Sequence, residues 1–206
     1  MGRICFTAEL DEAEGPLLLS REHRVSRDSF LKFVAANPEL RTELTAEGEM
    51  IVMPPAHSRT GNQNFEILLQ LGTWARRDGH GQAYDSSTGF DLPDGSNRSP
   101  DASWVMVSRL AMLSPDERDT YLPLCPDFVA ELRSKSDSVR MLRNKMIEYI
   151  ANGAKLGWLI DPIERTVHVY RPLRPVEILE DPAEVSADPE LPGFVLDLDP
   201  IFNPRF

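Results

Sequence analysis

Two acidic residues occur where the sequence predicts buried or strand-end positions. Asp101 follows Pro100 and begins the run ASWVMV, whereas Glu131 lies inside the apolar run DFVAEL. An ionised carboxylate among apolar neighbours is costly unless it is paired or binds a cation. Carboxylate oxygens are also the ligands that Mg²⁺ prefers. The two residues are therefore either paired in the fold or candidates for holding a cation.

Each of these acids also has an ordinary structural interpretation. Asp101 could be a turn or strand-start residue, because aspartate is common at such positions. In a strand, Val129, Glu131 and Arg133 would share one face. Glu131 could then simply pair with Arg133 on a half-exposed surface.

Lys145 is the third residue whose position is informative. In the helix predicted over 138–151, Met141 and Tyr149 lie four residues to either side of Lys145. Residues at this spacing share a helix face, so Lys145 lies on or beside the apolar face. It could direct its amine into a site. Alternatively, it could extend along the rim of the core with its amine in water.

The elements that must position these residues follow from the apolar periodicity and the turn signals. Their order predicts a mixed central sheet flanked by helices, of the α/β or α+β class, with an N-terminal helix–hairpin extension. The predicted helices are 29–36 (N-cap Ser26), 58–77 and 138–151, and the predicted strands are 40–45 and 50–53 (a hairpin), 82–86, 89–92, 102–107, 127–132, 156–160 and 166–170, with edge strands near 176–179 and 194–198.

Length and composition predict one globular domain. The chain has 206 residues, of which 41% are hydrophobic and 27% charged, an ordinary globular mixture. Residues 1–25 show no period and are expected to form a loosely held arm. A single domain over 26–206 is expected to follow, with a core at about 40–171 and an acidic extension at 172–206. No apolar run approaches the length of a membrane span, and no secretion signal is evident, so we expect a cytoplasmic protein without a membrane partner, in which Cys5 and Cys125 are reduced thiols.

The charge distribution bears on a nucleic-acid partner. The net charge is −11, made up of −4 over residues 1–50, −1 over 51–160 and −6 over 161–206. The middle of the chain is therefore nearly neutral although both ends are acidic. Since phosphate binding depends on local basic surfaces, this charge argues mildly against non-specific DNA binding without excluding it.

Two blocks of the sequence resemble the Uma2 family, once called DUF820, of restriction-endonuclease-like proteins. One block spans 89–162 and contains GFDLPDGSNRSPDASWV and PDFVAELRSKSDSVRMLRNKMIEYIANGAKLGWLIDP; the other is RTELTAEGEMIVMPPAHSRTGNQNFEILLQL, and together they cover about three quarters of the chain. The resemblance implies a PD-(D/E)XK core in which Asp101, Glu131 and the backbone carbonyl of Leu132 hold one or two Mg²⁺ (or Mn²⁺) ions. Arg133 stands where the superfamily has a lysine, and arginine cannot accept a proton. In Uma2-like proteins the lysine lies on the following helix, which here corresponds to Lys145.

Several other residues are also candidates. Helix capping, the polarity of a loop or a solvated helix face would account for their polar side chains equally well or better. The candidates that could line the site or bind metal are His57, Glu66, Asp85 and Arg133, and those that could contact phosphates are Ser134, Ser136, Arg140 and Arg143.

The resemblance implies a Mg²⁺-dependent endonuclease that hydrolyses phosphodiester bonds of DNA. A homodimer is expected because a duplex has two strands to cut. The alternative is a nuclease fold that no longer cuts and works as a binding or regulatory module. Arg133 and the acidic composition favour this alternative, whereas the joint presence of Asp101, Glu131 and Lys145 favours the enzyme. A metal-dependent hydrolase with another substrate is a third interpretation.

Overall fold

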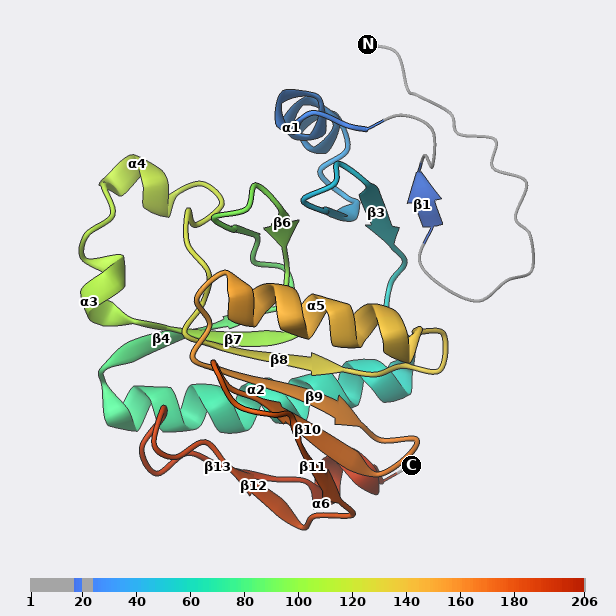
Figure 1. Cartoon of the computed structure of the whole chain (residues 1–206), viewed down its shortest axis with the longest axis vertical. Coiled ribbons are helices and arrows are strands. Elements are labelled where there is room, and N and C mark those ends of the chain that lie inside the picture. Colours follow the sequence, from blue (N-terminus) through green and yellow to red (C-terminus); the bar gives the residue numbers. More distant parts are fainter. Residues whose placement is uncertain (1–16, 20–23, 206) are drawn as a thin grey trace.

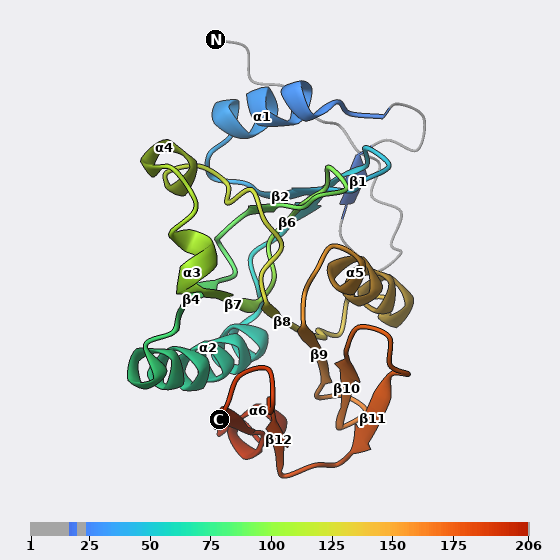
Figure 2. The same ribbon diagram turned by 60° about the vertical axis from the view of Figure 1, so that its left-hand side comes forward.

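The computed structural model describes residues 17–19 and 24–205. The expected N-terminal arm lies mostly outside the described residues. Within it, β1 (Leu17–Leu19) pairs antiparallel with β3 (Met50–Met53). The C-terminal end of the described chain packs below the main sheet in the view of Figure 2.

The centre of the fold is a six-stranded mixed sheet. β8 and β9 are parallel, and the other neighbouring strands are antiparallel. Its strands, in spatial order, are β11 (Glu177–Glu180), β10 (Thr166–Tyr170), β9 (Leu156–Asp161), β8 (Phe128–Leu132), β7 (Ala102–Met106) and β4 (Gly81–Asp85).

A second, smaller sheet lies beside the main sheet, with α1 (Arg27–Ala36) above it (Figures 1 and 2). Its strands, in spatial order, are β1, β3, β2 (Arg41–Leu44), β6 (Asn97–Arg98) and β5 (Phe90–Asp91). The remaining elements are α2 (Ser58–Asp78), α3 (Val107–Leu110), α4 (Pro115–Arg118), α5 (Val139–Ala151), α6 (Asp199–Phe202) and the two-stranded pair β12 (Glu184–Ser186) and β13 (Val195–Asp197).

The two faces of the main sheet pack against different helices. Alternate strand residues point to opposite faces, so Trp104 and Phe128 pack in one core cluster with Leu71 of α2 and with residues of the C-terminal segment. Val129 points the other way and packs with Tyr149 of α5 in a second cluster. In Figure 1, α5 accordingly crosses in front of the sheet and α2 runs along its other side.

Local sequence explains where the two long helices begin and end. In α2 the buried residues Ile67, Leu71 and Ala75 recur every four positions, which gives one buried stripe. The helix ends at Gly79, whose φ of 73° lies in the left-handed region that glycine adopts at little cost. α5 buries Met146 and Tyr149, so the face that also carries Lys145 is turned toward the protein.

The mixed α+β architecture predicted from the sequence is confirmed. The predicted helices and main-sheet strands are present with bounds shifted by one or two residues. Sequence periodicity missed β1, β6, β12, α3, α4 and α6, because elements of two to four residues are too short to show a repeat. Within the described residues, no helix is both long and apolar enough to cross a membrane.

Candidate active site

Asp101 and Glu131 lie at the same end of two neighbouring strands. Ala102 of β7 is paired with Ala130 of β8, and continuing this antiparallel register places Asp101 opposite Glu131 on the same face. The Leu132 N–H donates to Asp101 Oδ2 at 2.9 Å. Asn64 of α2 donates to the other oxygen, Oδ1, at 3.2 Å. A hydrogen bond from the sheet and one from α2 thus fix the orientation of the two carboxylate oxygens of Asp101.

The ammonium group of Lys145 lies between two carboxylates. Its Nζ is 2.9 Å from Glu131 Oε1 and 2.9 Å from Glu43 Oε1. Glu131 belongs to the main sheet and Glu43 to β2 of the small sheet, so α5 carries Lys145 into the space between the sheets. The side chains of Glu43 and Glu131 are 2% and 5% exposed, which makes these buried rather than surface ion pairs.

Tyr149, one turn after Lys145, fixes the same oxygen of Glu131. Its hydroxyl donates to Glu131 Oε1 at 2.9 Å. Burial, together with the neighbouring carboxylates of Glu131 and Glu43, raises the pKa of Tyr149 well above its ordinary value. The phenol therefore remains a neutral donor. Since Lys145 and Tyr149 both contact Oε1, Oε2 is the oxygen of Glu131 left to bind another group.

An arginine bridge holds Glu43 from behind. Arg98 of β6 contacts Glu43 Oε2 through Nη1 at 3.1 Å. It also contacts Glu148 of α5 through two parallel bonds of 2.8 and 2.6 Å, the fork geometry in which arginine binds carboxylates most strongly. The Ser99 N–H donates to Glu43 Oε1 at 2.9 Å. These contacts tie the small sheet to α5 and fix the carboxylate that faces Lys145.

The pKa shifts in the cluster follow from burial and from the several carboxylates around one amine. Burial raises the pKa of Glu131 to about 7; the Lys145 ammonium opposes this shift, and the charges of Asp101 and Glu43 add to it. Burial also raises the pKa of Asp101. Against the effect of burial, the cations Lys145 and Arg98 hold the pKa of Glu43 below its ordinary value. Although burial opposes it, the carboxylates of Glu131 and Glu43 raise the pKa of Lys145.

The donor chemistry fits a hard divalent cation. Four acids, counting Glu148, surround two cations, so the fully ionised cluster has an excess of two negative charges. Asn64 Oδ1, beside Asp101, is buried without a hydrogen-bond partner. No group of three or more His, Cys, Asp or Glu side chains is arranged as a complete metal cage in the described part of the chain. Mg²⁺ ordinarily needs only one or two protein carboxylates and keeps several waters, so a pair of neighbouring acids is compatible with its coordination.

Comparison with known proteins places this chain in a family. The family described as "Putative restriction endonuclease", Uma2, matches residues 27–199. The chain belongs to the Uma2 family. A solved structure described as a "putative nuclease belonging to DUF820" from Anabaena variabilis ATCC 29413 is similar to this Uma2 protein, with a TM-score of 0.72 and 24% identity over 86% of this chain and 97% of the other. At that identity the likeness shows the fold. No curated protein matches the chain.

Arg133 of this Uma2 protein does not take part in the cluster. Its Nη1 lies 2.8 Å from Oδ2 of Asp161, at the end of β9. The sequence-based interpretation that Arg133 pairs with Glu131 on a half-exposed face is therefore wrong. Glu131 is buried and contacts Lys145, because the chain leaves β8 after Leu132 and turns Arg133 toward the neighbouring strand.

The other predicted residues lie around the cluster or away from it. Asp85 is exposed at the end of β4, where its Oδ1 accepts the N–H and O–H of Ser87, so it acts as a turn residue in the structure. His57 is exposed at the N-cap of α2 and makes no side-chain capping bond. Glu66 is half-buried on α2, the hydroxyls of Ser134 and Ser136 lie 3.1 Å apart, and Arg140 and Arg143 are exposed on α5.

Sequence reasoning missed five residues of the cluster, one of which is Glu148 of α5. Glu43 and Arg98 lie in strands of four and two residues, where alternation cannot be recognised. Asn64 and Tyr149 lie within predicted helices and could have been found from spacing. Tyr149 follows Lys145 by four residues, which places both on one helix face.

Proposed function

We propose that this Uma2 protein is a Mg²⁺-dependent (or Mn²⁺-dependent) endonuclease that hydrolyses phosphodiester bonds of DNA at Asp101, Glu131 and Lys145. One observation carries the proposal: a lysine ammonium 2.9 Å from Glu131 and 2.9 Å from Glu43, next to Asp101, in a buried cluster with excess negative charge. This charge balance favours a divalent cation, and a hard cation beside a fixed ammonium is suited to a phosphoryl group.

The residues have distinct roles in this proposal. Asp101 and Glu131 would hold the ion, with the Leu132 carbonyl as a further ligand, and the ion would supply water activation and charge neutralisation at the phosphoryl group. The contacts of Lys145 with Glu131 and Glu43 keep it protonated. It therefore offsets negative charge that develops in the transition state, rather than accepting a proton. Tyr149 orients Glu131, and Glu43 positions Lys145.

Substrate binding is assigned to the exposed part of α5 and the loop before it. Arg140 and Arg143 are exposed there, and the hydroxyl of Ser134 lies nearby in sequence. Cationic side chains of this kind contact phosphate oxygens without reading bases. Because the chain carries a net charge of −11, we expect DNA affinity to be modest and strongly salt-dependent.

A second function is favoured by the position of Arg133. The residue in the usual lysine position is engaged by Asp161, which also suits a nuclease fold retained as a binding or regulatory module. The nuclease and the binding module would share the same architecture, and only the nuclease would turn over substrate.

A cleavage assay separates the two functions. Plasmid and single-stranded DNA are incubated with Mg²⁺ or Mn²⁺ and with the wild type, Asp101→Ala or Lys145→Met. Glu164→Gln, at an exposed turn outside the cluster, is the matched control. We expect cutting by the wild type and the control, and a loss of about 10²-fold or more in the two cluster variants. Absence of cutting together with absence of Mn²⁺ binding by calorimetry would reject the proposed activity.

A further inference from the structure

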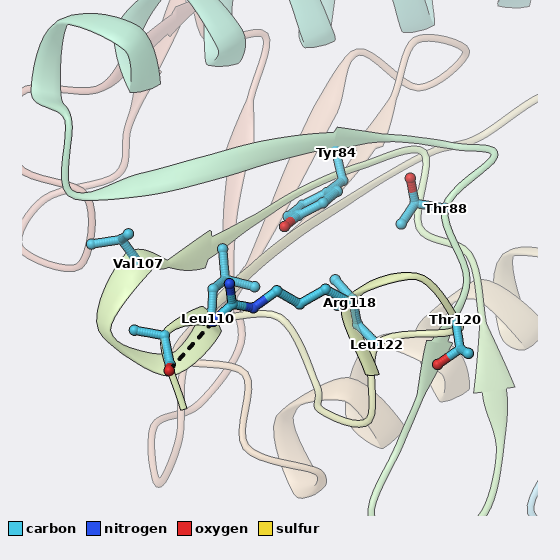
Figure 3. A pocket seen from close by; sticks show the side chains of 8 residues that line it. Tyr84, Thr88, Val107, Leu110, Arg118, Thr120 and Leu122 are labelled. Atoms are coloured by element: carbon cyan, nitrogen blue, oxygen red, sulfur yellow. Dashed lines mark hydrogen bonds between the residues drawn. The ribbon is translucent and has the colours of Figure 1, made fainter. Parts of the chain in front are cut away.

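The six-stranded sheet ends at β4 on one side and at β11 on the other. Hollows flank β4 on both faces. One, of about 450 Å³, is lined by Tyr84, Val107 and Leu110 among others, and Arg118 extends across it (Figure 3). The other, of about 730 Å³, lies between β4 and α2. Tyr84 and Thr88 line both hollows. Among residues 17–19 and 24–205, β4 pairs with β7 alone, so its other edge forms a ridge between two depressions.

Apolar side chains are exposed in both depressions. Leu69 of α2 is 48% exposed and lines the larger hollow, and Val107 is 45% exposed and lines the smaller one. Gly72, one turn after Leu69, also lines the larger hollow, and a Cβ added there would meet nothing within 4 Å. Next to the exposed Leu69, Gly72 leaves room for another chain to approach α2 closely.

The two edge strands of the sheet, β4 and β11, differ in whether each could pair with the same strand of a second copy of the chain. Pairing β11 antiparallel with its own copy would place Glu177 opposite Glu180 of the partner strand twice, and like charges opposite each other repel. Pairing β4 with itself about Ala83 places Asp85 opposite Gly81, with no like charges opposed. The β11 edge is therefore protected by acids, whereas the β4 edge is not.

Charge complementarity favours a second copy of this chain as the occupant of the β4 edge. The larger hollow contains Arg76, near the C-terminal end of α2, and Asp85, at the far end of β4. Since α2 is followed directly by β4, Arg76 lies toward the Gly81 end. An antiparallel copy of β4 brings its Asp85 to that end, so each hollow would receive one acid beside its arginine. We propose that β4 pairs antiparallel with β4 of a second copy of this chain, with the two-fold axis at Ala83.

This pairing has a functional consequence that rests on the proposed nuclease activity. The two-fold axis of such a joint sheet is perpendicular to it, so both clusters would open on the same face. With strands about 4.8 Å apart and a rise of about 3.3 Å per residue, the two Asp101 residues would lie roughly 25–30 Å apart. A single duplex lying across that face could then reach both sites.

The proposed pairing is tested by measuring the mass of the protein in solution. This measurement does not depend on catalytic activity. Sedimentation equilibrium of the wild type should give twice the chain mass of 23.2 kDa. Leu69→Glu places a charge in the interface and should raise the dissociation constant by about 30-fold. Ile147→Glu is the matched control, because Ile147 is 58% exposed on α5, away from β4, and should leave the dimer unchanged.

A charge exchange gives a second measurement that does not depend on apolar burial. Arg76→Glu and Asp85→Arg should each weaken the dimer, and the double variant should restore it. A monomeric wild type, or a dimer that survives Leu69→Glu and both single exchanges, would overturn the proposed pairing. A dimer without cleavage would overturn only the nuclease activity.

Discussion

Replacing Glu131 by glutamine should change how the stability of the fold depends on pH. Burial, with the acids nearby, raises the pKa of Glu131 from 4.5 to about 7. An acid with a raised pKa in the folded chain stabilises the fold below its unfolded pKa, and this contribution is lost as the pH rises through the folded pKa. At about 1.36 kcal/mol for each pH unit between the two values, the loss amounts to about 3 kcal/mol.

Glutamine has no proton to lose in this range. The free energy of unfolding of Glu131→Gln minus that of the wild type should therefore increase by about 3 kcal/mol between about pH 4 and about pH 9. Urea unfolding followed by tryptophan fluorescence measures it, because Trp158 lies buried on β9 next to β8. The exposed variant Glu164→Gln should show no such trend. A difference that stays constant or decreases with pH would refute the assignment of a destabilising charge to Glu131.

Three further changes have expected outcomes. Lys145→Met leaves buried carboxylates without their shared cation, so urea unfolding at about pH 8 should show a loss of about 3–5 kcal/mol; an unchanged midpoint would contradict the buried pairing. Arg133→Gln breaks the contact with Asp161 and should cost about 1–3 kcal/mol, while Mn²⁺ affinity measured by calorimetry stays the same. Gly81→Ala places a Cβ 2.2 Å from the ring of Trp104 and should lower the free energy of unfolding by about 1–3 kcal/mol or more, as calorimetric melting would show.

The sequence could predict the main sheet because its strands are apolar and its turns are marked. The same pattern singled out Glu131 as an acid inside an apolar strand, and helical spacing placed Lys145 on the inner side of α5. In the structure these two side chains are 2.9 Å apart. Their catalytic roles stay predictions, since geometry alone does not establish turnover.

The sequence could not predict contacts that depend on how distant segments dock. Glu43 and Lys145 are 102 residues apart and meet only because the small sheet packs over α5. Alternation along one strand also could not decide the partner of Arg133, because Asp161 lies on the neighbouring strand. Periodicity describes one element at a time, whereas the cluster combines two sheets and a helix.

The arginine bridge between the small sheet and α5 has a consequence for synthesis of the chain. Glu43 and Arg98 emerge from the ribosome well before Glu148 and Lys145, since translation proceeds from the N-terminus. Until then, Glu43 and Arg98, which are buried in the folded protein, lack the side chains of α5 that they contact there. The nascent protein therefore cannot complete this cluster until α5 has been translated, so N-terminal fragments that end before α5 lack the cluster.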